Sequence, residues 1–436
     1  MRSHFRGLLS PLTLAVLCIS FFPARAATGE PAAKPATDAT PSSSRVDAGL
    51  TLSEALRLAL THNPDLAIAR LELQAMAGAE TQAGARPNPE LGVLIEDTRN
   101  ATRTTTVQWA QPLELGGKRS ARLAAAARAR EQAGVALEAK QAELRAAVTS
   151  AFFELLGAQE QVRLSQGALE LARNAFGIAT KRLQAGKVPP LEQAKALVAE
   201  AAARADLAQS QSDQLLARQR LRALWGAGAV EFGQAAGNAE VLPDLPGAQR
   251  LGELIAEAPA MRLARLDIAR RQALSEGERA KRVPDLTLTV GAKRDAELGR
   301  TQAVIGLSMP LPLLDSNQGN LLEALRREDQ AREALTAVTL RLQAEVTQAL
   351  EKLRLTREQA QMLRREALPT AQTAYDAAVK GFELGKFAFI DVLDAQRTLF
   401  QLRQQILRNT ADAYRAATEL DRLLGSSAAS NGQSLE

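Results

Sequence analysis

The stretch "KGFELGKFAFIDVLDAQ" (380–396) is a second version of "KRLQAGKVPPLEQA" (181–194), and this pair decides how the chain is organised. Both stretches place a Gly-Lys turn before a long segment without further proline. Four other matches occur in the same order: "ARLELQA" (69–75) with "ARLDIAR" (264–270), "RPNPEL" (86–91) with "RVPDL" (282–286), "VQWAQPL" (107–113) with "IGLSMPL" (305–311), and "ALWG" (223–226) with "RLLG" (422–425). Ordered matches at a nearly constant spacing indicate an internal duplication.

The duplication divides the chain into repeats of residues 50–226 and 250–425, joined by a Gly/Pro-containing linker (227–247). Each repeat is predicted to contain a helix, a β-hairpin and a long helical hairpin. The predicted ranges are 65–85, 90–111 and 117–225 in the first repeat and 260–281, 285–309 and 318–424 in the second. A leader rich in Ala, Pro, Ser and Thr (27–48) precedes the repeats and is expected to be disordered, and a tail (426–436) follows them.

The first 26 residues resemble a secretory signal peptide. A basic start precedes the apolar segment "LTLAVLCISFF" (12–22), and "ARA" (24–26) has the small-x-small pattern of a cleavage site. Cys18, the only cysteine, follows Leu17, whereas a lipid-attachment cysteine follows a small residue. We therefore expect an exported, unlipidated mature chain.

Composition favours long helices and gives no reason to expect a nucleic-acid partner. The chain has 46% hydrophobic and only 3% aromatic residues, and long stretches consist of Ala, Leu, Glu, Gln, Arg and Lys. Cleavage removes three arginines and no acid, so the formal charge falls from +5 to about +2. No run of 18 apolar residues follows the signal peptide. Membrane contact is therefore expected through a β-barrel or at the surface.

The second predicted β-hairpin alternates apolar and small polar residues. Leu286, Leu288 and Val290 alternate with Thr287, Thr289 and Gly291, so one face of the strand is apolar and is expected to face lipid. "DTRNATR" (97–103) and "KRDAELGR" (293–300) are polar enough to be the turns. Four strands per chain cannot close a barrel, and their open edges favour pairing with other chains.

A helix of unusual length is predicted from Lys118 to Leu183, a stretch without proline that would extend roughly 100 Å. Apolar residues at strict seven-residue steps predict a coiled-coil seam along it. They are Val148, Leu155, Val162, Leu169, Phe176 and Leu183. The second repeat keeps this register, but Pro369 is expected to kink its long helix.

The last predicted helix carries a polar stripe. At 100° per residue, the members fall within a sector of about 80–100°. They are Asp391, Asp394, Thr398, Gln401, Gln405 and Asp412. A simpler interpretation is also open, because acidic residues often cap a helix start and a polar face can simply be solvated.

These features together resemble the TolC-type outer-membrane efflux factors over roughly residues 50–425. The resemblance rests on the tandem repeats, the "GKFAFIDVLDAQRTL" turn and helix (385–399), and the proline-containing strand ends. "QPLELGGKRSAR" (111–122) is similar to the heavy-metal branch of that family, the outer-membrane components of cobalt–zinc–cadmium resistance pumps. The resemblance implies the outer-membrane channel of a tripartite efflux system that conducts its substrate, divalent heavy-metal cations, from an inner-membrane pump and a periplasmic adaptor to the exterior.

The resemblance also implies an architecture and partners. The fold would be mainly α with a small β part, and a homotrimer would combine its strands into a twelve-stranded barrel in outer-membrane lipid, above a helical tunnel in the periplasm of a Gram-negative bacterium. A periplasmic adaptor (membrane fusion protein) and a proton-driven inner-membrane pump would be the partners. Asp391 and Asp394 would form the narrowest ring of the pore, and the rest of the stripe would line it. The adaptor would dock on the two hairpin tips: Gly186, Lys187, Val188 and Pro189, and Gly385, Lys386, Phe387 and Ala388.

The sequence also allows other classes of function to be weighed. An enzyme is disfavoured, because "LGGKRS" (115–120) lacks the first glycine of a P-loop and the mature chain retains a single histidine, His62. For the same reason neither a cofactor nor a resident metal site is expected. A periplasmic coiled-coil scaffold or the adaptor itself would share the helical hairpins, and an efflux factor for organic drugs would share the whole pattern.

Overall fold

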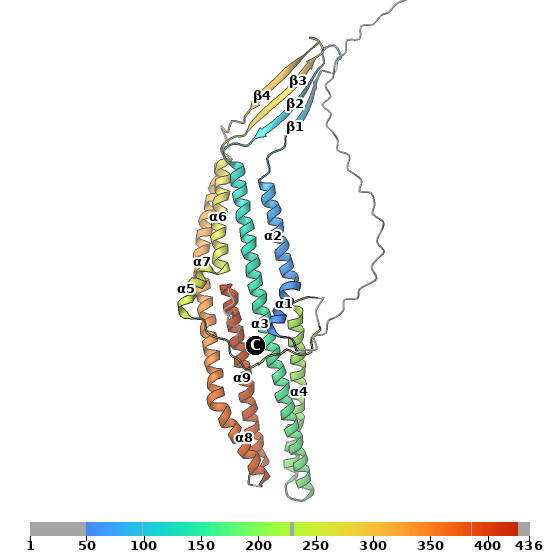
Figure 1. Ribbon diagram of the computed structural model, residues 1–436, viewed down its shortest axis with the longest axis vertical. Coiled ribbons are helices and arrows are strands. Elements are labelled where there is room, and N and C mark those ends of the chain that lie inside the picture. The colour runs from blue at the N-terminus through green and yellow to red at the C-terminus, as the bar shows by residue number, and fades with distance from the viewer. Residues whose placement is uncertain (1–48, 98, 227–230, 385, 426–436) are drawn as a thin grey trace, which may run out of the picture. The chain divides into compact units, whose positions relative to one another are not determined.

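The computed structural model describes residues 49–97, 99–226, 231–384 and 386–425. The expected signal peptide, leader and tail lie outside these ranges. Within them the chain is mainly helical with one small antiparallel sheet, which confirms the predicted fold class. Figure 1 shows the sheet beyond one end of the long helices and the hairpin turns at their other end.

Both halves of the chain have the same order of elements. The first half contains α1 (Leu52–His62), α2 (Pro64–Ala83), β1 (Glu90–Glu96), β2 (Thr104–Leu113), α3 (Lys118–Gln184) and α4 (Pro190–Ala223). The second half contains α5 (Ala248–Glu257), α6 (Pro259–Ala280), β3 (Leu286–Asp295), β4 (Arg300–Ser308), α7 (Gln318–Met362), a π-helical turn (Leu363–Ala367), α8 (Leu368–Glu383) and α9 (Phe389–Leu424).

The sheet joins the two halves, because its strands follow the order β1-β2-β3-β4 and every neighbouring pair is antiparallel. β3 continues through Lys293 and Arg294, which pair with Thr106 and Thr105 of β2. The polar turn expected over 293–300 is therefore too wide. Only residues 296–299 lie between β3 and β4.

One face of the sheet is apolar across all four strands. Directly paired residues share a face, and one such row contains Leu91, Trp109, Val290 and Ile305. Two of its side chains are among the most exposed apolar groups, with Leu91 at 73% and Ile305 at 77% exposure. The opposite face carries mostly polar or small residues, for example Gln108 beside Gly291, and only Leu94 and Val304 add larger apolar side chains to it. The alternation predicted for β3 thus extends over the whole sheet.

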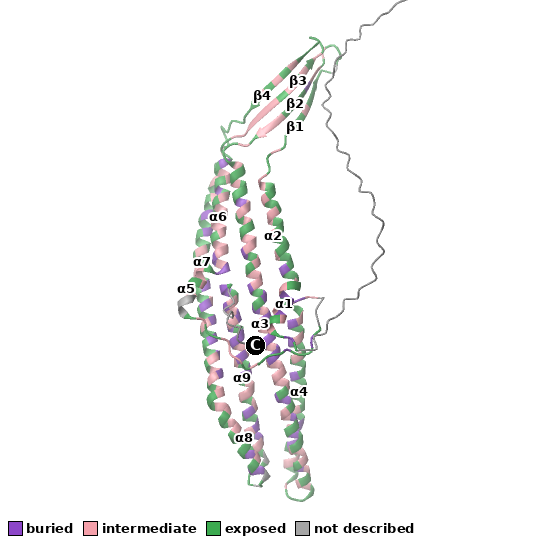
Figure 2. Ribbon diagram, in the orientation of Figure 1, coloured by how far each residue is buried: buried purple, intermediate pink, exposed green. Residues whose placement is uncertain are grey.

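The long helices pack side by side. α3 contacts α2, α4, α6 and α9, and α7 contacts α6 and α9. Figure 2 shows buried residues along the lines where helices adjoin and exposed residues on the remaining faces. The predicted seam on α3 lies within this packing, with Val148 and Leu155 almost fully buried.

The long helix of the second half is interrupted just before Pro369. The proline has no N–H and its ring excludes a normal turn against the carbonyl four residues earlier. The chain instead forms the π-helical turn, in which the Leu368 N–H donates to the Leu363 carbonyl five residues back. The helix axis changes direction between α7 and α8 (Figure 1).

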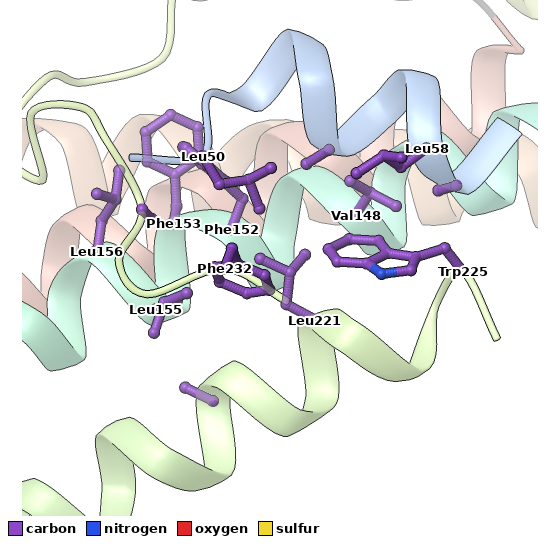
Figure 3. Packing of buried hydrophobic residues seen from close by; sticks show 14 of the residues in the cluster. Leu50, Leu58, Val148, Phe152, Phe153, Leu155, Leu156, Leu221, Trp225 and Phe232 are labelled. Atoms are coloured by element: carbon purple, nitrogen blue, oxygen red, sulfur yellow. The ribbon is translucent and has the colours of Figure 1, made fainter. Parts of the chain in front are cut away.

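The largest apolar core surrounds the middle of α3. Figure 3 shows Trp225, Phe232, Leu221 and Val148 close together there, and Leu50 belongs to the same cluster. Phe232 comes from the linker, and a short parallel bridge joins Leu50 to Ala235. The described part of the linker is therefore packed against the helices, because its apolar side chains complete this core.

An ion pair connects the first half to the second where the helices meet the sheet. The Lys118 ammonium at the start of α3 lies 2.7 Å from the Asp285 carboxylate, just before β3. The Leu115 N–H donates to the same carboxylate oxygen at 3.1 Å. Burial opposes ionisation of Asp285, but these two donors and the nearby Arg122 outweigh it, so the pKa of Asp285 is lowered.

We expect Asp285→Asn to lower the free energy of unfolding by about 2 kcal/mol at neutral pH, because it leaves the shielded Lys118 ammonium without a carboxylate. The folded-state pKa lies below the ordinary value of 3.8. The contribution of Asp285 is therefore complete above that value and is lost as pH falls through the folded-state pKa. Urea unfolding in detergent, at neutral and acidic pH, measures both effects.

The matched control is Asp329→Asn on α7, whose exposed carboxylate lies 3.1 Å from both Arg326 and Arg332. Exposed pairs contribute roughly 0–1 kcal/mol, so this variant should unfold almost as the wild type does. Equal destabilisation by the two substitutions would contradict a special role for the Lys118–Asp285 pair.

Candidate functional site at the hairpin turns

The polar stripe of α9 is an exposed face of the helix. Asp391, Asp394, Thr398, Gln401 and Gln405 are all exposed within the chain. Leu393, Leu399 and Ile406 face the other way and are buried. Asp412, the last predicted member, is only half-exposed and lies 2.5 Å from Arg415 in an ion pair. The structure thus places the first five predicted residues on one open surface, and engages the sixth in a local ion pair.

The two aspartates at the start of α9 differ in their contacts. The Asp391 carboxylate accepts a hydrogen bond of 3.0 Å from the Ala388 N–H, so it caps the helix start. Asp394 lies nearly one turn further along. Within the described residues, its carboxylate has no hydrogen-bonding or ionic partner and is exposed. Helix capping therefore accounts for Asp391 but leaves Asp394 without a structural role in the single chain.

The first tip, between α3 and α4, is a tight turn that requires glycine. Gly186 has φ of +67°, a left-handed conformation that other residues adopt only with strain. The Gly186 N–H donates to Leu183 and the Lys187 N–H to Arg182, each at 2.9 Å, which ends α3. Lys187 and Pro189 are exposed and Val188 is half-buried. Pro190 then begins α4.

The second tip, between α8 and α9, has Phe387 at the position of Val188 in the first, and Ala388 and Phe389 stand where the first has Pro189 and Pro190. Gly385 lies outside the described residues, whereas Lys386, Phe387 and Ala388 are exposed. The N–H groups of Lys386 and Phe387 both donate to the Gly381 carbonyl, at 2.8 and 3.2 Å. The Phe387 ring, 50% exposed, lies so close to Gly381 that any Cβ there would overlap it.

The two tips are held together by a small cluster of packed residues. Phe382 and Leu393 of the second hairpin pack with Ala179 and Ala196 of the first. The Arg182 guanidinium lies 4.2 Å from the centre of the Phe382 ring, and its Nη2 donates to the Phe382 carbonyl at 3.4 Å. Sequence reasoning missed Arg182 and Gly381 as site residues, although the repeat alignment already places these unlike residues at equivalent positions.

The described residues hold no cluster suited to a resident metal ion and no spanning helix. They contain no group of three or more His, Cys, Asp or Glu side chains that could bind a metal. None of their helices is long and apolar enough to cross a membrane.

A sheet with one exposed apolar face, joined to long paired helices whose far turns carry exposed acids, defines the subunit of an outer-membrane efflux channel. The family described as "Outer membrane efflux protein" matches residues 55–227 and 251–426, and the chain belongs to this family. It is an outer-membrane protein that extends into the periplasm.

Two metal-resistance proteins are similar to this chain over much of its length. The chain is 44% identical over 423 residues to the cobalt-zinc-cadmium resistance protein CzcC of Cupriavidus metallidurans, a match that covers 96% of this chain and 100% of that protein. It is 27% identical over 300 residues to the nickel-cobalt-cadmium resistance protein NccC of Alcaligenes xylosoxydans xylosoxydans, covering 66% and 67% of the two chains.

Solved structures share the fold. A crystal structure of CusC matches with a TM-score of 0.74 at 21% identity, covering 86% of this chain and 92% of that one. The outer-membrane channel OprN matches with a TM-score of 0.71 at 20% identity, covering 86% and 90%.

We expect Gly381→Ala to open the second tip, because the added methyl group would displace the Phe387 ring and weaken the two hydrogen bonds to the Gly381 carbonyl. Hydrogen–deuterium exchange should then be several-fold faster at the Lys386 and Phe387 amides than in the wild type.

The matched control is Gly177→Ala on α3, since an added Cβ there meets no atom within 4 Å. Its exchange at the second tip should be that of the wild type. Unchanged exchange in Gly381→Ala would show that contact with Phe387 does not shape this turn.

Proposed function

We propose that this protein is the outer-membrane channel of a tripartite system that exports divalent heavy-metal cations of the cobalt, zinc and cadmium type. A periplasmic adaptor and a proton-driven inner-membrane pump would deliver the cations to it. The observation that carries the proposal is the exposed apolar face of the four-stranded sheet. The sheet lies at one end of the long helices, and the acidic tip lies at their other end. The full-length identity to CzcC supports heavy metals over organic drugs as cargo.

The sheet supports assembly as a trimer. β1 and β4 are the outer strands within one chain, so each has an edge that this sheet does not pair. Closing three copies into one barrel would pair β4 of one copy with β1 of the next and satisfy both edges. The apolar face, with Leu91, Ile305 and Leu307 exposed, would then contact lipid and the polar face would line the lumen.

The acidic end of α9 supports a cation-conducting constriction. In a trimer, Asp391 and Asp394 from three copies would form a ring of carboxylates at the periplasmic mouth. Such a ring raises the local concentration of cations and repels anions. Thr398, Gln401 and Gln405 would continue the polar lining along the same face. Because the described chain has no cluster of metal-ligating groups, it would attract cations by charge and leave their selection to the pump.

The two unlike tips support docking of an adaptor. Both are exposed, and the Phe387 ring gives the second tip an exposed aromatic side chain where the first has Val188. Since Arg182 and Phe382 tie the hairpins together, an adaptor that separates the tips would have to disrupt this contact. That requirement would couple docking to opening of the mouth.

The lipid-facing assignment predicts a sharp difference between neighbouring residues on β4. Ile305 lies on the apolar face and Val304 on the opposite one, beside Gly291. A lysine on a lipid-facing strand near the bilayer midplane costs about 2–4 kcal/mol. In a strain lacking the gene, the wild type and Val304→Lys should form outer-membrane trimers and restore growth in zinc, cobalt and cadmium, whereas Ile305→Lys should fail in both respects.

Two results would contradict this prediction. Normal trimers of Ile305→Lys with loss of Val304→Lys trimers would reverse the face assignment. A deletion strain that is sensitised to organic drugs, with unchanged tolerance of the three metals, would overturn the proposed cargo and leave the channel in place.

The constriction predicts separate effects for the two aspartates. Asp394→Asn should lower the cation-to-anion permeability ratio by several-fold and weaken block by divalent ions from the tip side, without changing thermal stability. Asp391→Asn should change both permeation and stability, because it also weakens the cap on Ala388. Single-channel recording in a planar bilayer and thermal unfolding measure the two properties.

Asp329→Asn, an exposed carboxylate on α7, is the charge-matched control and should leave permeation unchanged. If Asp394→Asn also leaves the permeability ratio and the block unchanged in an assembled trimer, the stripe is only a solvated helix face.

A further inference from the structure

A groove of about 700 Å³ lies where the sheet meets the helices, outside the site already described. Its basic side comprises Lys118, Lys281 and Arg282, at the start of α3 and just after α6. Its other side is the loop "PLPLLD" (310–315), which leads from β4 to α7. Nothing in the proposed conduction pathway uses this groove.

The loop exposes leucine side chains to an unusual degree. Leu313 is 84% and Leu314 97% exposed, and Leu311 is also well exposed. Pro310 and Pro312 each lack an N–H, so the chain leaves the sheet here without forming further strand pairs. A water-facing connection is normally polar, so this cluster of leucines indicates an apolar partner.

The equivalent segment of the first half differs. It runs from Leu113 to Lys118, is shorter, and engages its acid, Glu114, in an ion pair with Arg122. Its leucines, Leu113 and Leu115, are less than half exposed. The apolar loop is therefore a feature of the second half alone, and strand-end geometry as such does not require it.

The loop follows directly on the strand that carries the apolar face. Ala303, Ile305 and Leu307 occupy alternate positions on β4, and the exposed leucines of the loop come three to six residues after the strand ends at Ser308. Because β4 ends where the periplasmic helices begin, the loop lies at the periplasmic border of the proposed lipid-facing surface. At that border a membrane presents its phospholipid headgroups.

The groove beside the loop contains one cation, Arg282, that no carboxylate of the described residues neutralises. Three cations face two carboxylates, Asp285 and Asp315. Asp285 is already engaged by the Lys118 ammonium, and Asp315 accepts a hydrogen bond of 2.8 Å from the Asn317 N–H. Lys281 is paired with Glu278 but remains exposed. Among the described residues Arg282 has no carboxylate partner, so its guanidinium remains available to an anion.

We propose that this groove binds an anionic phospholipid of the periplasmic leaflet. The lipid phosphate would contact Arg282 and Lys281, and its acyl chains would cover Leu311, Leu313 and Leu314. A cationic rim beside an apolar loop fits a phospholipid, because the anionic headgroup would contact the rim and the acyl chains would contact the loop. A free anion would leave the loop exposed, and an uncharged apolar molecule would leave the rim without a counter-charge. The proposal rests on the proposed function, since it requires the sheet to be in the outer membrane.

The test is native mass spectrometry of the detergent-solubilised assembly with added phosphatidylglycerol or phosphatidylcholine. We expect the wild type to bind phosphatidylglycerol about tenfold more tightly, because each Lys or Arg adds to the attraction of anionic lipid. Lys281→Gln with Arg282→Gln should abolish this preference. Leu313→Ser with Leu314→Ser should weaken binding of both lipids.

The matched control is Arg326→Gln with Arg327→Gln, an adjacent exposed pair on α7, which should keep the preference. No preference in the wild type, or an unchanged preference in Lys281→Gln with Arg282→Gln, would overturn the proposal. If Leu313→Ser with Leu314→Ser dissociates the assembly while lipid binding per chain is unchanged, the loop contacts a second copy and the proposal is equally wrong.

Channel recordings on the same preparations separate this inference from the proposed function. If the wild-type assembly conducts ions but shows no lipid preference, only the inferred lipid site is refuted. If the assembly neither inserts into the bilayer nor conducts ions, the proposed function is refuted, and the lipid site that depends on it is refuted as well.

Discussion

The pairing of β2 with β3 is the contact on which the arrangement of the two halves depends. Ten residue pairs, from Thr104 with Asp295 to Leu113 with Leu286, join a strand of the first half to a strand of the second. Because each strand continues into long helices, this pairing sets the helices of the two halves side by side. The Lys118–Asp285 ion pair reinforces the same junction. At the far end, the contact between Arg182 and Phe382 connects the hairpins again.

The exposed apolar and polar surfaces of the single chain are the reason for proposing that the protein works as an assembly. The apolar sheet face and the polar stripe of α9 are both exposed, although each would be matched by a different environment: lipid for the first and a water-filled lumen for the second. The open edges of β1 and β4 add a third requirement, which only further strands can meet. A membrane-inserted ring of copies satisfies all three requirements at once.

The repeats differ at several places, at the ends of the helices and within them. At the tips, Val188 and Pro189 of the first half correspond to Phe387 and Ala388 of the second, and after the strands the exposed leucines of the β4–α7 loop have no equally exposed counterpart. Within the helices, Pro369 gives the second half a π-helical turn that the first half lacks.

The sequence by itself determined the duplication, the order of elements and the α3 seam, because these depend on local periodicity and on proline and glycine positions. It also predicted the alternation of Leu286, Leu288 and Val290 and the exposed stripe from Asp391 to Gln405. It could not separate Asp391, which caps α9, from Asp394, because a cap depends on where the Ala388 N–H points. The sequence also did not predict the ion pair of Asp412, the burial of the linker residue Phe232 in the core, or the pairing of Lys118 with Asp285. Those contacts join residues whose proximity only the tertiary packing decides, since no local pattern in the chain records which distant backbone or side chain will lie beside them.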